Sequence, residues 1–299
     1  MLIKVDSSVN EAVKACFGNE ISVINNAGTI RGGISLATPL SLSNGLVVIL
    51  KTNSIKNEDF FEAETEGLHA IASTETVRTP KLFCRGKDEE KGISFLMMEY
   101  IETGRETKET WIRLGHEFAD MHLADTKSFV PGGRYGFHHD NYIGATPQIN
   151  TPGESWIDFF RECRLIPQLK MASHYLETRD MKAADRLLEH LDDYLYEPER
   201  PSLLHGDMWG GNHLIGKEGK AVLIDPAAYV GHSEADIAMT DMFWSLPGSF
   251  YDAYHEKIPA EPGFKDRREI YNLYHWLNHL NLFGTGHLMQ VLRIIRHFA

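Results

Sequence analysis

The sequence is poor in three features that would each define a class of protein. It has only three cysteines, Cys16, Cys84 and Cys163, which are too few and too scattered for a disulfide framework or a zinc site. No apolar run reaches the ~20 residues of a membrane-spanning helix, and the amino terminus lacks the apolar segment of a signal peptide. Positive charge is also scarce, since the net charge is −12. We therefore expect a cytoplasmic protein that binds neither nucleic acid nor a membrane.

Late in the chain, the sequence contains two loops with acidic and amide side chains that are typical of catalytic sites. His205-Gly-Asp-Met-Trp-Gly-Gly-Asn212 includes Asp207 and Asn212, and the apolar run that follows ends at Asp225. Phosphoryl transfer from ATP needs one carboxylate to orient the acceptor hydroxyl, and an amide oxygen and a second carboxylate to hold Mg²⁺. The pattern H-G-D-x-x-x-x-N resembles the H-R-D-x-x-x-x-N loop of protein kinases. It predicts Asp207 as the catalytic residue and Asn212 and Asp225 as metal ligands, although a turn and a helix cap would explain either residue alone.

An apolar strand in the first part of the chain ends at a lysine. Leu46-Val-Val-Ile-Leu50 precedes Lys51, and the next segment, 57–74, has helical periodicity. A kinase-like fold places there the lysine that contacts the ATP phosphates and the helix glutamate that pairs with it. Lys51 is therefore predicted to bind ATP, and Glu62, Glu64 and Glu66 are the candidates for its partner.

Two further segments are predicted to contact ATP. Gly28-Thr-Ile-Arg-Gly-Gly33 could cover the phosphates through Gly32 and Gly33, although an ordinary hairpin turn explains it about as well. The apolar segment 93–101 runs into a polar exit and resembles the hinge of kinase folds. We assign Met98 as its bulky residue, and the Glu99 carbonyl and Ile101 N–H as adenine contacts; a core strand is the alternative.

These assignments predict an α+β protein with a bilobal, protein kinase-like fold. Residues 1–102 would form an amino-terminal ATP-binding lobe around a five-stranded antiparallel sheet, and residues 103–299 a mainly helical catalytic and substrate-binding lobe. Asp236 is predicted to accept hydrogen bonds from the catalytic loop or to cap its helix. Apolar periodicity predicts helices at 11–17, 57–74, 110–124, 180–195, 231–242 and 272–283.

The residues around both loops resemble the fructosamine kinase family, also called ketosamine 3-kinases. The resemblance covers most of the chain and includes the segments 201–212, 224–238, 141–148, 159–165 and 274–284, with Trp209 as its most specific residue.

The resemblance also bears on single residues. It favours Glu64 among the three glutamates, leaving Glu62 and Glu66 as solvent-facing alternatives, and it assigns Trp209 and His232 to the substrate. One departure is Ser233, where the family usually has an arginine. Asn278, on an otherwise apolar helix face, could line the sugar site or join a buried hydrogen-bond network.

The resemblance implies a kinase that uses ATP and Mg²⁺. Its acceptor would be the 3-hydroxyl of a ketosamine, a ribulosamine or fructosamine adduct on a lysine, either protein-bound or small-molecule. Phosphorylation there makes the adduct labile, as deglycation repair requires. A kinase of the same fold for an aminoglycoside, choline or homoserine, and a non-catalytic nucleotide-binding protein, are the alternatives. We expect a monomer or a weak homodimer.

Overall fold

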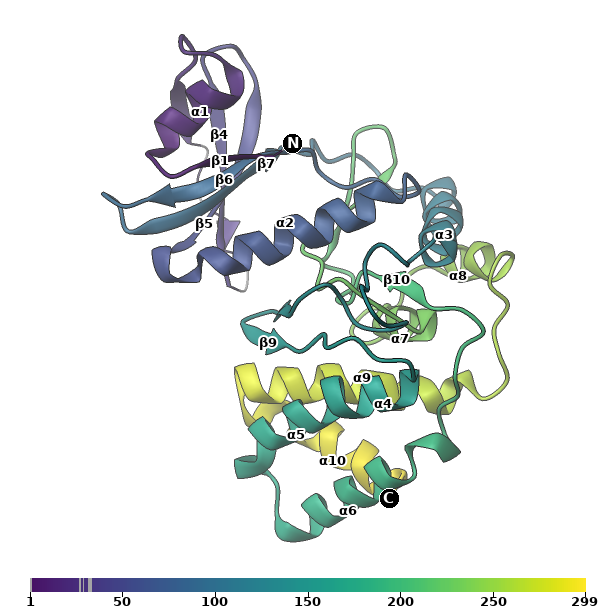
Figure 1. Cartoon of the computed structure of the whole chain (residues 1–299). Helices are drawn as coiled ribbons and strands as arrows, with labels where there is room; N and C mark the ends of the chain where they lie inside the picture. Colours follow the sequence, from purple (N-terminus) through teal and green to yellow (C-terminus); the bar gives the residue numbers. More distant parts are fainter. Residues whose placement is uncertain (1, 27, 29, 32–33) are drawn as a thin grey trace.

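A computed structural model places the chain in two lobes (Figure 1). It describes residues 2–26, 28, 30–31 and 34–299. The smaller lobe holds a β-sheet flanked by two helices, the larger lobe is mainly helical, and a short segment after residue 99 joins them. The α+β class and the bilobal architecture expected from the sequence are confirmed. The boundary between residues 102 and 103 stays a prediction.

The sheet of the smaller lobe has seven strands within the described residues, two more than expected. Its order is β1-β6-β7-β5-β4-β2, with β3 paired to β4, and the pairs are antiparallel except for the parallel pair β1–β6. The sequence missed β1 and β3 because runs of two or three residues carry no readable alternation, and tertiary pairing decides them. The strands are β1 Ile3–Val5, β2 Val23–Asn26, β3 Ile30–Arg31, β4 Leu36–Leu42, β5 Val47–Ser54, β6 Leu82–Asp88 and β7 Ile93–Glu99.

The two faces of this sheet are covered by different helices. In β7, Phe95 and Met97 point into the core beneath α1 (Val9–Phe17), whereas Leu96 and Met98 pack against Phe61 of α2 (Glu58–Ser73). This division follows from the two-residue period of a strand. Burial on both faces is the reason why 93–99 reads as a continuous apolar run rather than an alternating one. A 3-10 turn at Ile55–Asn57 leads into α2.

The carboxyl-terminal end of α2 belongs to the core of the larger lobe. Ala70, Ile71 and Val77 are buried among the side chains of that core. The Leu223 N–H donates to the Arg78 carbonyl at 2.9 Å, so the chain after α2 also pairs with the larger lobe. The helix therefore bridges the two lobes (Figure 1).

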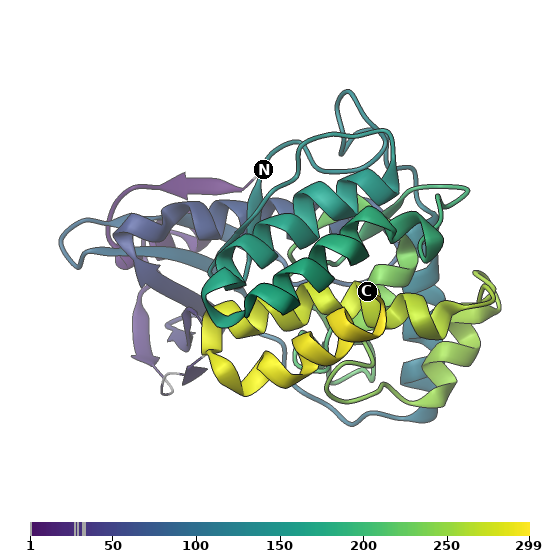
Figure 2. The ribbon, with the colours of Figure 1, turned by 90° about the horizontal axis from the view of Figure 1, so that it is seen from below.

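The larger lobe is built from helices that enclose three short strand pairs. Figure 2 shows α4–α6 lying beside α9 and α10, and α3 packs on α8. The strand pairs carry the connecting loops that form the site. The helices are α3 Lys108–Leu123, α4 Trp156–Phe160, α5 Ile166–Ala172, α6 Thr178–Glu189, α7 Ser233–Met239, α8 Gly248–His255, α9 Phe264–Phe283 and α10 Leu288–His297; the strand pairs are β8 Asn141–Ile143 with β9 Thr146–Gln148, β10 Ser202–Leu204 with β13 Tyr229–Gly231, and β11 His213–Ile215 with β12 Ala221–Leu223.

Three expected helix boundaries are wrong. The helix expected at 180–195 ends at Glu189, where His190 leaves the helical conformation before a short 3-10 turn. The helix expected at 231–242 is limited to α7, and the one expected from 272 begins eight residues earlier, at Phe264, because its first turns are charged and carry no apolar stripe. Within the part of the chain that the structure describes, no helix is long and apolar enough to cross a membrane.

Candidate active site

The loop between β10 and β11 depends on two glycines for its shape. Gly206 has a φ of 79°, and a Cβ there would lie 2.1 Å from the Ala227 carbonyl oxygen. A Cβ on Gly211 would lie 2.2 Å from the Trp209 ring. Only glycine therefore lets this loop meet the 224–228 loop and lets the indole fold back over its own loop.

Asp236 of α7 anchors the same loop from below. Its Oδ2 accepts from the His205 N–H at 2.6 Å and its Oδ1 accepts from the Gly206 N–H at 2.8 Å. His122 Nε2 lies 3.2 Å from Oδ2, and the other ring nitrogen of His122 hydrogen-bonds the Tyr254 hydroxyl at 2.7 Å. The anchoring role expected for Asp236 is thus observed, and His122 is a buried structural residue. A buried carboxylate with this many partners fixes the loop position.

Asp207 and Asn212 meet at the open side of the loop. The Asn212 Nδ2 donates to Asp207 Oδ2 at 2.9 Å and to the Asp207 carbonyl at 2.8 Å. Burial raises the pKa of Asp207 to about 7, although the hydrogen bond from Asn212 lowers it in part. The amide is oriented with its nitrogen toward Asp207, so its oxygen remains available to a cation.

His205 joins the two loops through its ring. The Nε2 atom lies 3.0 Å from the Ile224 carbonyl oxygen, and Nδ1 accepts from the Asp207 N–H at 3.3 Å. Because Nδ1 is the acceptor, the proton is on Nε2 and donates to Ile224. Burial lowers the pKa of His205. A neutral His205 therefore holds Asp207 and the residue before Asp225 in register.

Lys51 of β5 reaches across to two carboxylates. Its Nζ lies 2.7 Å from both oxygens of Glu64 on α2 and 2.6 Å from Oδ1 of Asp225. Desolvation opposes the ammonium, but the two carboxylates outweigh it and raise the pKa of Lys51. Desolvation likewise opposes ionisation of Asp225, yet Lys51 lowers the pKa of that carboxyl. Asp225 has a φ of 54°, an uncommon conformation for a residue other than glycine that is typical of functional sites.

The other two glutamates of α2 lie elsewhere. Glu62 contacts Arg85, and Glu66 faces His139. Gly32 and Gly33, expected to cover the phosphates, fall outside the described residues.

The expected hinge residues end β7 and enter the connection between the lobes. Met98 is buried against Phe61, as the alternative of a core strand also requires. The Glu99 carboxylate accepts from Arg78 Nη2 at 2.6 Å and from the Lys81 N–H at 3.0 Å. Ile101 is buried. The structure therefore places these residues where β7 ends and the connection to the larger lobe begins, while their contact with adenine stays a prediction.

Trp209 lies on the surface next to Asp207. Its ring stacks on Trp244 with centroids 6.2 Å apart and planes at 28°, and Phe243 meets it edge-on at 5.9 Å. Trp244 is 68% exposed, which is unusual for so large an apolar ring. An aromatic surface thus borders the catalytic loop.

His232 and Asn278 are not at this surface. His232 is buried, its Nδ1 accepts from the Glu234 N–H at 3.1 Å to cap α7, and burial lowers its pKa to about 3. Asn278 is buried too, with its Oδ1 accepting from Gln168 Nε2 at 3.3 Å. Each side chain is enclosed by protein in this structure, and direct contact with substrate stays an untested prediction. For Asn278 the buried-network alternative fits.

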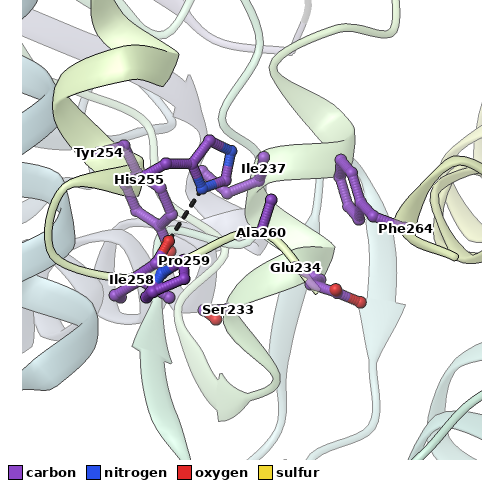
Figure 3. A pocket seen from close by; sticks show the side chains of 9 residues that line it. All are labelled: Ser233, Glu234, Ile237, Tyr254, His255, Ile258, Pro259, Ala260 and Phe264. Atoms are coloured by element: carbon purple, nitrogen blue, oxygen red, sulfur yellow. Dashed lines mark hydrogen bonds between the residues drawn. The ribbon is translucent and has the colours of Figure 1, made fainter. Parts of the chain in front are cut away.

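Ser233, which stands where an arginine is usual, lines a separate pocket between α7 and α8 (Figure 3). Tyr254 and His255 lie on one side of it, and His255 Nδ1 hydrogen-bonds the Ile258 carbonyl at 2.8 Å. The neighbouring Glu234 forms a two-pronged ion pair with Arg267 of α9, both contacts at 2.7 Å. The pocket contains none of the residues around Asp207, so Ser233 affects the site only indirectly.

Sequence reasoning missed two amides that hold the loop at 224–228. Asn141 Nδ2 donates to the Ala228 carbonyl at 2.7 Å, and Gln148 Nε2 donates to the Ala227 carbonyl at 3.0 Å. Both come from the hairpin β8–β9. Their available signal was the placement of two amides inside the segment 141–148 of the family resemblance.

Comparison with known proteins assigns the chain to a family. The family model described as fructosamine kinase matches residues 5–299. The chain is 38% identical to the chloroplastic protein-ribulosamine 3-kinase of Arabidopsis thaliana, over 91% of this chain and 82% of that one. It is 32% identical to the ketosamine-3-kinase of Mus musculus, over 93% and 96% of the two chains.

Solved structures agree on the fold. A protein of Thermobifida fusca, assigned as a fructosamine-3-kinase, superposes with a TM-score of 0.83 at 30% identity, covering 97% of this chain and 98% of that one. Spectinomycin phosphotransferase, solved with ADP and spectinomycin, shares the fold at a TM-score of 0.56 and 15% identity, over 97% and 92% of the two chains.

The two-lobed fold, with a lysine, three acids and an amide gathered between its lobes, defines a phosphotransferase of the protein kinase-like class that acts on an alcohol group. Within that class, the chain belongs to the fructosamine kinase family.

Proposed function

We propose that this protein is an ATP-dependent kinase that phosphorylates the 3-hydroxyl of ketosamines as a step of deglycation repair. The observation that carries the proposal is the convergence of Asp207, Asn212, Asp225 and Lys51 in a chain whose relatives are named ribulosamine 3-kinase and ketosamine-3-kinase. The family match favours ketosamines over other acceptors.

The residues present fit ATP and Mg²⁺. Mg²⁺ takes oxygen ligands, and Asn212 Oδ1 and the Asp225 carboxylate supply them beside a lysine whose charge Glu64 holds in place. Asn212 and Asp225 would hold the metal, and Lys51 would contact the phosphates. Spectinomycin phosphotransferase, which shares the fold, was solved with ADP, and this supports a nucleotide as the phosphoryl donor. When bound, ATP supplies the phosphoryl group and Mg²⁺ neutralises its charge.

The chain's own residues then position the acceptor. Asp207 accepts the proton of the attacking hydroxyl as a general base, a role that suits a carboxylate whose pKa is near 7. His205 and Asp236 keep the Asp207 backbone fixed, so little reorganisation accompanies the transfer. Trp209 offers an aromatic face to the sugar or to its amine substituent.

The test is ATP consumption with Mg²⁺ on ribuloselysine and fructoselysine, with the phosphate position determined by NMR. We expect transfer to O3 of at least one adduct, and transfer slowed by ~10²–10⁴-fold in the Asp207→Asn variant. Phosphorylation of choline or an aminoglycoside without any ketosamine would overturn the substrate. ATP-dependent thermal stabilisation without turnover on any acceptor would overturn the enzymatic activity itself.

A further inference from the structure

Three potential metal ligands meet between the lobes, outside the site around Asp207. Glu66 comes from α2, and His138 and His139 come from the segment between α3 and β8. One ligating atom from each residue lies within 4.8 Å of the other two. A search of the described residues for three or more histidine, cysteine or acidic side chains close enough to share one ion finds these three.

Both histidine rings are already oriented by contacts away from Glu66. The Nδ1 of His139 lies 2.9 Å from the Asp140 carbonyl and donates to it, so Nε2 carries the free lone pair. His138 packs on the Phe137 ring with centroids 4.2 Å apart. A second nitrogen bonded to a backbone carbonyl is the arrangement that fixes the tautomer and direction of metal-binding histidines.

The carboxylate of Glu66 supplies an independent indication. Its Oε2 faces both rings, in ion-pair contact with His139 and 3.6 Å from Nε2 of His138. This oxygen is buried, and the two imidazole nitrogens are the groups that face it. A buried carboxylate needs a donor or a counter-charge. A cation held jointly with the two rings would supply that charge.

We propose that Glu66, His138 and His139 bind a divalent transition metal of the Zn²⁺ type, with water completing its coordination. Two imidazoles and one carboxylate suit Zn²⁺ and related ions, whereas Mg²⁺ prefers oxygen ligands alone. The two histidines are part-exposed, which gives the ion access from solvent. The site is therefore chemically distinct from the Mg²⁺ ligands Asn212 and Asp225.

The metal would join a helix of one lobe to a segment of the other. Glu66 lies two residues after Glu64, which pairs with Lys51. The helix α2 and the hairpin β8–β9 also meet through the Phe60 and Tyr142 rings, whose centroids are 4.3 Å apart. A coordinate cross-link at Glu66 adds a strong bond to this packing. Bound metal therefore restrains the middle of α2 against local opening.

The test uses the full chain, freed of metal by dialysis, with Co²⁺ as a spectroscopic substitute for Zn²⁺ and millimolar Mg²⁺ present throughout. We expect a saturable visible absorption with one Co²⁺ per chain, displaced by Zn²⁺. Glu66→Gln and His139→Asn should each weaken binding at least tenfold. The matched control is His190→Asn, because His190 lies 3.3 Å from the Asp193 carboxylate but belongs to no such three-ligand group.

A second measurement tests whether metal restrains α2, and it does not depend on enzymatic activity. Hydrogen exchange of the α2 amides should slow on addition of Zn²⁺ in the wild type and not in His139→Asn. The proposal is overturned if the wild type takes up no stoichiometric Co²⁺, or if Glu66→Gln and His139→Asn, shown to be folded by circular dichroism, bind it as the wild type does.

Discussion

At the residue scale, the environment of Asp207 suits the proposed catalytic role and lowers the stability of the fold at high pH. The carboxyl group is surrounded by protein, and Asn212 is its one side-chain donor among the described residues. Burial favours the neutral form, which places its pKa at about 7. A base with such a pKa is half ionised near neutrality, so both the rate and the stability of the enzyme should change there.

The rate should rise with pH through this value. Only ionised Asp207 can accept the hydroxyl proton, so kcat/KM should increase about tenfold per pH unit below about 7 and level off above it. Burial lowers the pKa of His205, which favours its neutral form. A pH profile from 5.5 to 9 checks this, and a flat profile across that range would contradict the assignment of Asp207.

Replacing Asp207 with asparagine should separate chemistry from binding. The variant loses the base but keeps an oxygen for Asn212, so we expect kcat to fall by ~10²–10⁴-fold with ATP binding retained. Single-turnover kinetics and nucleotide titration measure the two effects. An Asp207→Asn enzyme with near wild-type turnover would show that another group takes the proton.

The same substitution should stabilise the fold at high pH. The folded pKa of Asp207 lies above its unfolded value of 3.8, so its favourable contribution is complete below that value and is lost as pH rises through about 7. Asp207→Asn should therefore raise Tm at pH 8, by an amount that shrinks toward pH 5. Asp185→Asn, on the exposed side of α6, is the control and should leave Tm unchanged at both pH values.

At the element scale, α7 is the support of the catalytic loop. Its Asp236 accepts from two consecutive backbone N–H groups, and an asparagine offers one acceptor oxygen where the carboxylate offers two. We expect Asp236→Asn to lower stability by about 2–3 kcal/mol, because one buried donor loses its partner.

Two measurements check this role. In Asp236→Asn, the Tm should fall by several degrees. The fold decrease in kcat should exceed the fold increase in the KM for ATP. Asp241→Asn, which breaks a half-exposed ion pair with Arg268 just beyond the same helix, should cost less than about 1 kcal/mol. Equal effects of the two substitutions would argue against a supporting role for Asp236.

Elements with long periodic patterns could be predicted from the sequence, and those decided by distant contacts could not. The helix α2 was expected because its apolar residues repeat at regular intervals, and the strand β7 because its apolar run is continuous. The strand β1 has three residues and depends on its parallel partner β6. Likewise, the loop motif pointed to Asp207, Asn212 and Asp225, but no local signal links Gly206 to the Ala227 carbonyl or Asn141 to Ala228, which are joined only by folding.

At the scale of the whole molecule, the two lobes share a core. Ile71 belongs to α2 of the smaller lobe and is fully buried in the core of the larger one. We expect Ile71→Ala to destabilise by about 2–5 kcal/mol and to lower the unfolding midpoint reported by tryptophan fluorescence. That signal comes from the larger lobe alone, because all five tryptophans follow residue 103.

A matched substitution shows whether the coupling is specific to α2. Leu42→Ala removes a fully buried leucine from the core beneath α1, away from the larger lobe. If the lobes unfold separately, Leu42→Ala changes circular dichroism before fluorescence, while Ile71→Ala still moves the fluorescence transition. A fluorescence midpoint that does not respond to Ile71→Ala would refute the shared core.

The embedding of α2 in the larger lobe has a consequence for how the cell could control this enzyme. A helix whose far end is buried in a second core cannot rotate outward without exposing Ala70 and Ile71 to water. This burial opposes the outward rotation of α2 that would separate Glu64 from Lys51, so we expect no dormant form of the kind that phosphorylation activates. We expect its output to follow its abundance and the supply of damaged amines, as befits an enzyme of constant maintenance.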